Sequence, residues 1–108
     1  MKIHKDIPVF PLKSIILPGG QFPLRIFERR YLDMTRDCLK NNAGFVIALP
    51  KKDSDYISSV YDYASYVEIV DWSQLDGGLL GITVEGKNIV KLSECKLDEC
   101  NLLKGNAE

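Results

Sequence analysis

The chain has 108 residues, of which 45% are hydrophobic and 27% charged, and its formal net charge is −1. This length allows one domain with one ordinary core, and this composition excludes wholesale disorder. The net charge argues against a dedicated nucleic-acid-binding protein, because such proteins hold phosphates with a basic surface.

The cysteines and the apolar runs indicate the cellular compartment of the protein. No apolar run approaches the roughly 18 residues that a membrane-spanning helix needs, and the first residues do not resemble a signal peptide. The cysteines, Cys38, Cys95 and Cys100, are odd in number, which predicts free thiols in a reducing compartment. We therefore expect a cytoplasmic protein without membrane association. Cys95 and Cys100 are too widely spaced for a common zinc-binding pair, and His4 is the only histidine, so we expect no metal and no cofactor.

Residues 7–31 are rich in proline and contain four of the five prolines of the chain: Pro8, Pro11, Pro18 and Pro23. Proline cannot donate a hydrogen bond within a sheet, so it favours edge strands and strand starts. Short strands are therefore predicted at residues 9–12, 15–17 and 22–26, with a reversal at Gly19 and its neighbouring glycine.

A helix is predicted at residues 29–40, where apolar residues recur on one face and charged residues on the other. Cys38 lies on the apolar face. We expect it to be an inert buried thiol, because no positively charged histidine stands near it in the sequence to lower its pKa. The Asn-Asn-Ala-Gly sequence at residues 41–44 is typical of a helix end.

The next part of the chain predicts strands. The continuous apolar run at residues 45–49 indicates a strand that is buried on both faces, and residues 51–59 form a polar loop. Residues 60–72 alternate in polarity, which favours a long strand with one face on the core. A connection at 72–78 follows, with Asp-Gly as a turn signal.

The last part is less regular. Residues 79–85 and 89–92 are predicted to form a hairpin through a turn at 86–88. Residues 93–108 allow a final strand or a short amphipathic turn, and residues 105–108 are expected to fray. About six or seven short strands, one helix and no βαβ alternation favour a mainly β (α+β) fold, closed or nearly closed into a barrel.

No catalytic constellation is found in the sequence. Residues 81–88 fit G-x-x-x-x-G-K, but Asn88 stands where a phosphate loop needs serine or threonine, and the segment predicts strands on both sides. No G-x-S-x-G elbow is present, and Asp53 and Asp55 lie in a polar loop without an apolar pocket. We therefore expect a protein that is not an enzyme.

Two stretches resemble a known family: FPLKSIILPGGQFPLRIFERRYLDM at residues 10–34 and EIVDWSQLDGGLLGITVEGK at residues 68–87. The first is very close to the opening signature of the Lon protease N-terminal (substrate-binding) domain, and the chain is similar in particular to small stand-alone LON-domain proteins. The resemblance implies a PUA-like pseudo-barrel of about six short strands with one helix. It also implies that residues 1–108 form a single barrel lobe without the helical lobe that usually follows.

The family signature covers twelve positions: Pro11, Leu12, Pro18, Gly19, Pro23, Leu24, Arg25, Ile26, Phe27, Glu28, Arg30 and Tyr31. For Arg25, Glu28 and Arg30 we favour a structural role, in ion pairs or backbone contacts that close the barrel against the helix. A role in substrate contact is the alternative.

The resemblance and the composition together predict a non-catalytic module that binds unfolded polypeptide or a protein partner. Aromatic side chains are favoured anchors at such surfaces, and the candidates are Phe22, Tyr61, Tyr63, Tyr66 and Trp72. The same tyrosines are also explained as packing residues on a barrel wall. Two other functions are kept open: a PUA-like RNA-binding module, which the net charge disfavours, and an adaptor for one folded protein.

Overall fold

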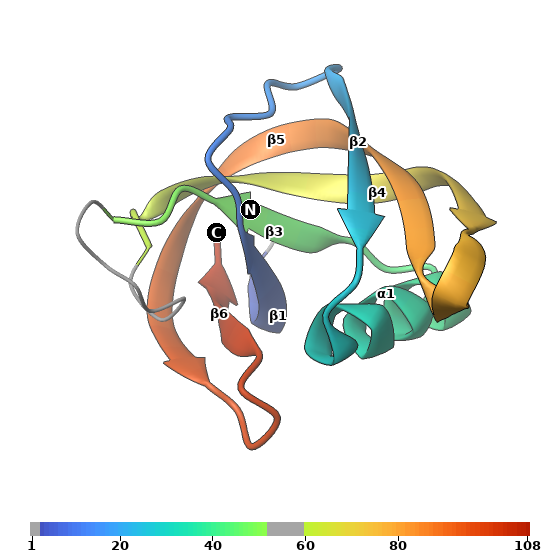
Figure 1. The fold of residues 1–108 in the computed structure, drawn as a ribbon. Coiled ribbons are helices and arrows are strands. Elements are labelled where there is room, and N and C mark those ends of the chain that lie inside the picture. The colour runs from blue at the N-terminus through green and yellow to red at the C-terminus, as the bar shows by residue number, and fades with distance from the viewer. Residues whose placement is uncertain (1–2, 52–59) are drawn as a thin grey trace.

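The computed structural model describes residues 3–51 and 60–108. It contains one helix, one short 3-10 helix and six strands (Figure 1). Their bounds are β1 (His4–Pro11), β2 (Gln21–Ile26), α1 (Arg29–Asn41), β3 (Phe45–Ala48), β4 (Tyr63–Gln74), η1 (Asp76–Gly78), β5 (Leu80–Leu97) and β6 (Leu103–Ala107). In this described part of the chain, no helix is long and apolar enough to cross a membrane.

Five of the strands close into a ring. Strand β1 pairs with β3 and β6, β3 with β4, β4 with β5, and β5 with β6. The sixth strand, β2, pairs with the first half of β5 and ends the sheet on that side. The predicted mainly β barrel with one helix is therefore confirmed. One pair, β1 with β3, is parallel, because β2 and α1 lie between these strands in the chain.

The core consists of two clusters that share strand β3. Phe45 and Ile47 pack with the buried face of α1, with β2 and with the first half of β5. Val46 and Ala48 point the other way and pack with β1, β6 and the second half of β5. Successive side chains of a strand alternate between faces, and each face of β3 is covered by one cluster. All four residues of β3 are therefore buried. The predicted two-sided burial of this strand is confirmed.

Helix α1 also follows the prediction. Its buried residues lie on one face, and they are Tyr31, Leu32, Met34, Thr35 and Cys38. The helix ends at Asn42, which adopts the left-handed conformation with φ 52°. Asparagine tolerates this conformation better than most residues, so the residues after the helix reverse the chain at little cost.

The predicted hairpin at residues 79–92 is wrong. Strand β5 is continuous through Gly86, and β4 is long enough to pair with both of its halves. Glycine is needed at residue 86 because the loop before β2 comes close to the backbone of β5 there. The N–H of Gly86 donates to the carbonyl oxygen of Gly20 at 2.8 Å, and a Cβ on Gly86 would collide with the carbonyl oxygen of Leu17. A bulge at this point lets β5 bend around the molecule (Figure 1).

Two more predictions about the chain are corrected. Residues 15–17 are not a strand; they form a loop in which the buried Ile16 accepts a hydrogen bond from the Ser65 hydroxyl at 2.7 Å. Residues 105–108 are not frayed, because most of them belong to β6, which pairs with β1 and β5, and Ala107 is fully buried. The strand propensity of these residues did not indicate that β1 and β5 would pair with β6 on either side.

The boundaries of β4 also differ from the prediction. This strand begins at Tyr63 and continues to Gln74, so the reversal to β5 is confined to residues 75–79 around η1. Of the polar loop predicted at residues 51–59, only Lys51 lies within the described residues.

Candidate functional site: an apolar groove beside strand β2

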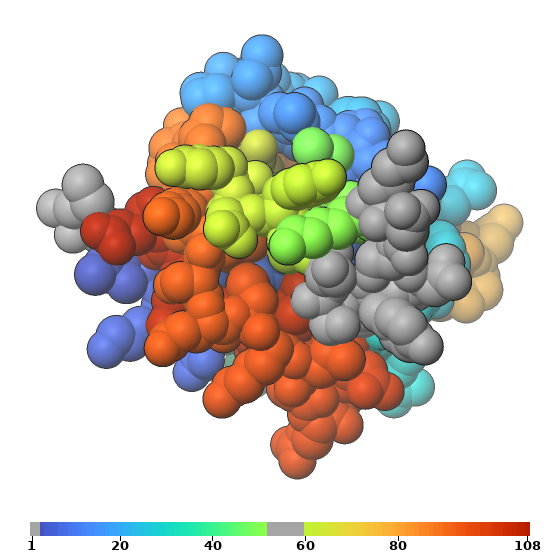
Figure 2. Space-filling view, turned by 90° about the vertical axis from the view of Figure 1, so that its left-hand side faces the viewer, coloured from blue at the N-terminus to red at the C-terminus, as the bar shows by residue number. Residues whose placement is uncertain are grey.

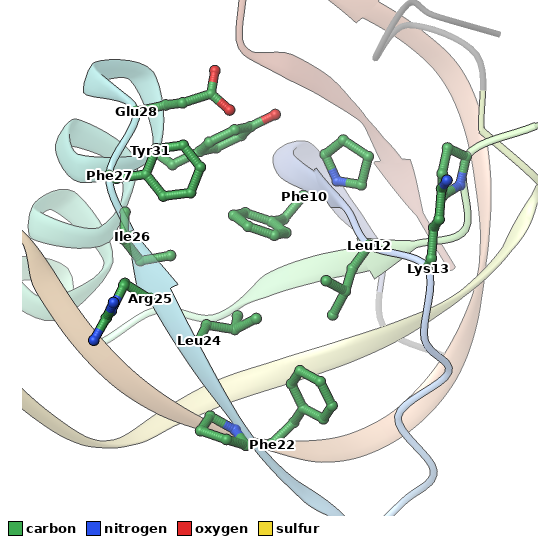
Figure 3. A pocket seen from close by; sticks show the side chains of 13 residues that line it. Phe10, Leu12, Lys13, Phe22, Leu24, Arg25, Ile26, Phe27, Glu28 and Tyr31 are labelled. Atoms are coloured by element: carbon green, nitrogen blue, oxygen red, sulfur yellow. The ribbon is translucent and has the colours of Figure 1, made fainter.

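A groove of about 650 Å³ lies between β2 and the end of β1. Figure 3 shows side chains from the two sides converging on it. It is lined by Phe10, Pro11, Leu12, Lys13, Phe22, Pro23, Leu24, Arg25, Ile26, Phe27, Glu28, Tyr31 and Pro50. The groove is thus built mainly from the signature segment, folded back on itself by the turn at Gly19.

The floor of the groove is apolar and rigidly supported. Phe10 lies at its centre (Figure 3), with its ring centroid 4.6 Å from that of Tyr31 and 6.3 Å from that of Phe45 in the core. Leu24 and Ile26 are buried beneath the groove, whereas Leu12 and Phe22 are only partly buried. Partly buried apolar side chains that are fixed by core neighbours present a preformed surface to a ligand.

The rim carries an exposed aromatic ring and two positive charges. Phe27 is 66% exposed, although the alternation of β2 would place a polar residue at such a position. Lys13 and Arg25 are exposed at the rim, where the Arg25 guanidinium points away from the floor of the groove (Figure 3), and within the described residues neither forms an ion pair. The groove therefore combines apolar contact area with an excess of positive charge.

Arg30 fixes the end of the groove where α1 begins. Its guanidinium bonds the Glu28 carboxylate at 2.7 Å and donates to the carbonyl oxygen of Asn101 at 3.0 Å, and it lies 4.9 Å from the centroid of the Tyr31 ring. These contacts join the start of α1 to the turn before β6. Glu28 is therefore already paired and does not offset the charge of Lys13 and Arg25.

The hydroxyl of Tyr31 is a polar group within this apolar site. Tyr31 is 5% exposed, and its Oη finds no hydrogen-bond partner among the described residues. In Figure 3 the ring extends from α1 toward the groove. Burial raises the pKa of Tyr31, an effect that the charge of Arg30 opposes and that of Glu28 reinforces. The hydroxyl is thus protonated at neutral pH and can donate to a carbonyl oxygen of a ligand.

The structure brings only some of the predicted site residues together. Phe22 lines the groove with the signature residues Pro11, Pro23, Arg25, Glu28 and Tyr31. Pro18 and Gly19 lie outside it, in the turn before β2, and Gly19 has the positive φ of 85° that this turn requires. Arg30 supports the site from behind.

The four aromatic residues predicted from the region around β4 are dispersed. Trp72 is 51% exposed beside Arg25, in a smaller depression on the other side of β2, and Tyr66 stacks on His4 with ring centroids 4.7 Å apart. Tyr61 and Tyr63 are exposed, and Tyr63 begins β4 opposite Lys91 of β5. Figure 2 shows the face on which the start of β4 lies beside the second half of β5. The four aromatic residues do not form one continuous surface with Phe22.

Seven groove residues were not among the predicted site residues: Phe10, Leu12, Lys13, Leu24, Ile26, Phe27 and Pro50. One signal for Phe27 was available, since it is an apolar residue at an outward position of an alternating strand. No signal in the sequence indicated that Phe10 and Leu12 would lie opposite β2, because that depends on where the turn at residues 13–20 places the two strands.

A small barrel with a preformed apolar groove is typical of a binding domain. The comparison with known families identifies which one. Residues 6–107 match the ATP-dependent protease La (LON) substrate-binding domain, so the chain belongs to this family. The resemblance carried by the signature, and the assignment to a substrate-recognition module, are therefore confirmed.

Solved structures agree with this assignment. A Lon N-terminal domain protein from Xanthomonas campestris is similar over 100% of this chain and 59% of its own, with 29% identity and a TM-score of 0.83. The N-terminal domain of Mycobacterium avium complex Lon protease is similar over 96% of this chain and 54% of its own, with 16% identity and a TM-score of 0.72, which supports the fold. This chain thus spans less than two thirds of either structure. No curated protein sequence matches it significantly.

Proposed function

We propose that this domain binds unfolded or extended polypeptide segments in the groove beside β2 and catalyses no reaction. The observation that carries the proposal is the groove itself: signature residues form a fixed apolar floor, and the aromatic ring of Phe27 stands exposed on its rim. An unfolded client offers apolar side chains that a folded protein hides, so an apolar groove selects it without reading a defined sequence.

The ionisable groups of the groove suit recognition rather than reaction. Glu28 is held by Arg30, and the raised pKa of Tyr31 keeps its hydroxyl protonated. Lys13 and Arg25 are exposed to solvent, where their side chains can attract carboxylates. Each of these groups can orient a bound segment. We expect individual affinities to be weak, because a flexible chain loses much conformational entropy when it binds.

A ¹⁵N NMR titration tests this proposal. The domain is titrated separately with a permanently unfolded protein and with a short single-stranded RNA. We expect the unfolded protein to shift the amide signals of residues 10–13 and 22–31, and the RNA to leave them unchanged. Shifts confined to the region around Tyr61 and Tyr63 would refute binding in the groove. Salt-sensitive shifts with RNA alone would favour the nucleic-acid alternative.

A folded adaptor partner remains the second candidate, and the same titration addresses it. Silence with both ligands would refute recognition of unfolded segments. The exposed apolar side chains Tyr63 and Ile89, which flank a small apolar depression outside the groove, would then be the first surface to test with folded partners.

A further inference from the structure

Strand β2 has a sheet neighbour on one side only. It pairs with β5 from Gln21 to Ile26, and it stands at the end of the strand order. Among the described residues no other strand pairs with its outer edge, whereas each strand of the ring pairs with at least two others. An unpaired edge presents backbone N–H and C=O groups that can hydrogen-bond a further strand.

The backbone groups that face this edge follow from the register. The N–H of Gly86 donates to the carbonyl oxygen of Gly20, just before β2, so the carbonyl of residue 20 faces β5. Along an antiparallel ladder, positions whose backbone groups face the partner strand alternate with positions whose backbone groups face away. The backbone groups of Gln21, Pro23 and Arg25 therefore face away from β5. Proline is tolerated at the middle position because no donor to β5 is needed there.

The groove lies along the same strand. All residues from Phe22 to Phe27 line it, and its floor is formed by Phe10 and by the side chains of Leu24 and Ile26. A segment that adds to the outer edge of β2 would point alternate side chains at this floor. The hydroxyl of Tyr31, which has no partner among the described residues, lies within reach of the groove as an additional donor.

The charges of the groove restrict the ligand further. Lys13 and Arg25 contribute two positive charges, while Glu28 is neutralised by Arg30 at 2.7 Å. A segment that carries a carboxylate next to its apolar residues is therefore electrostatically complementary to this site, and a basic segment is repelled.

We propose that the ligand binds as an added β-strand on the free edge of β2, and that the preferred segment has apolar residues at alternate positions next to an acidic residue. This inference rests on the proposed function and specifies its mode. The N–H groups of Gln21 and Arg25 and the carbonyl oxygen of Pro23 bond the backbone of the ligand, whereas the floor contacts its side chains. The backbone contacts explain how clients of varied sequence share one site, because every polypeptide offers the same groups.

Two isomeric peptides provide the test. The parent is a seven-residue peptide with leucine or phenylalanine at alternate positions, polar residues between them and one glutamate at the end. One isomer is N-methylated at the odd amides and the other at the even amides. Only one set of amides can face β2, so we expect one isomer to bind about tenfold or more weakly than the other.

Amide hydrogen exchange supplies an independent readout. On binding of the parent peptide we expect new protection at Gln21 and Arg25, while Phe22 and Leu24, which already bond to β5, change little. Equal affinities of the two isomers without new protection would overturn strand addition but leave recognition in the groove intact. Failure of every peptide to bind would overturn the proposed function as well. Protection of Gln21 and Arg25 that grows with protein concentration alone would assign the edge to a second copy of the chain and also overturn the proposal.

The charge preference has its own control. A peptide with glutamine in place of glutamate should bind the wild-type domain more weakly, and the difference should shrink in Lys13→Gln and Arg25→Gln variants. Lys91→Gln removes an exposed positive charge from a residue that does not line the groove, so it should preserve the difference. A preference that persists in the Lys13→Gln, Arg25→Gln double variant would refute the assigned role of these side chains.

Discussion

Replacing Phe27 with alanine is expected to weaken binding of unfolded polypeptide about tenfold and to leave the stability of the domain almost unchanged. The ring is 66% exposed in the free domain, so its removal opens no cavity in the core. The same exposure leaves most of its apolar area available to a ligand. The substitution of Phe27 should therefore lower the affinity for the ligand while leaving the free energy of unfolding almost unchanged.

The magnitude follows from the exposed area. A phenylalanine side chain can bury roughly 200 Å², so the exposed two thirds leave about 130 Å² for a ligand to cover. At about 25 cal/mol per Å² full coverage is worth about 3 kcal/mol, and coverage of half the ring about 1.5 kcal/mol. The smaller figure corresponds to about tenfold in the dissociation constant.

Fluorescence anisotropy with a labelled unfolded client measures the effect, and urea denaturation checks the stability of each variant. Tyr63→Ala and Leu17→Ala are matched controls, because these side chains are 68% and 65% exposed and lie outside the groove. Both should bind as the wild type does. If Tyr63→Ala weakened binding while Phe27→Ala did not, the binding surface would lie on β4 and our reasoning from the groove would be wrong.

Four further predictions concern stability and thiol reactivity. Gly86→Ala should cost more than about 2 kcal/mol in urea denaturation, because its Cβ would meet backbone, whereas Gly19→Ala should cost only about 1 kcal/mol for its positive φ; equal costs would contradict the close approach. Burial, reinforced by a neighbouring carboxylate, raises the pKa of Cys38 from 9.0 to about 11, so alkylation near pH 8 followed by mass spectrometry should modify the exposed Cys100 and spare Cys38. Because the unfolded chain ionises this thiol first, its contribution to stability is complete below pH 9.0 and should be lost as the pH rises toward about 11, and a Cys38→Ala variant should lack this component. Arg30→Gln should lower the free energy of unfolding by about 1 to 2 kcal/mol through loss of its charged hydrogen bonds, and an unchanged value would show that this ion pair is dispensable.

Local patterns in the sequence predicted the elements whose formation depends on local physics. Helix α1 was predicted almost to its ends, because its apolar stripe and its asparagine-rich end are encoded within a few residues. The two-sided burial of β3 followed from its unbroken apolar run. The edge position of β2 agrees with Pro23, whereas Pro8 and Pro11 lie in β1, which pairs with a strand on either side.

The errors occurred where distant partners decide the outcome. Gly86 resembles a turn residue locally, but β4 holds it within a long strand, and the loop before β2 presses against it. Residues 105–108 are of types that are depleted in strands, yet β1 and β5 pair with most of them on either side. Strand formation depends on the neighbour more than on the residue, so a single sequence underdetermines it.

The same division holds for the candidate site. The sequence alone determined the family, through the signature at residues 10–34. It also determined the chemical nature of the side chains that line the groove, most of which belong to this segment. Only the tertiary structure decided that Phe10 and Leu12 would lie across from β2, that the aromatic residues of β4 would be dispersed, and that the outer edge of β2 would stay open beside an apolar floor. The physical reason is that a groove is a relation between two segments, and their separation is set by ring closure of strands far apart in the chain.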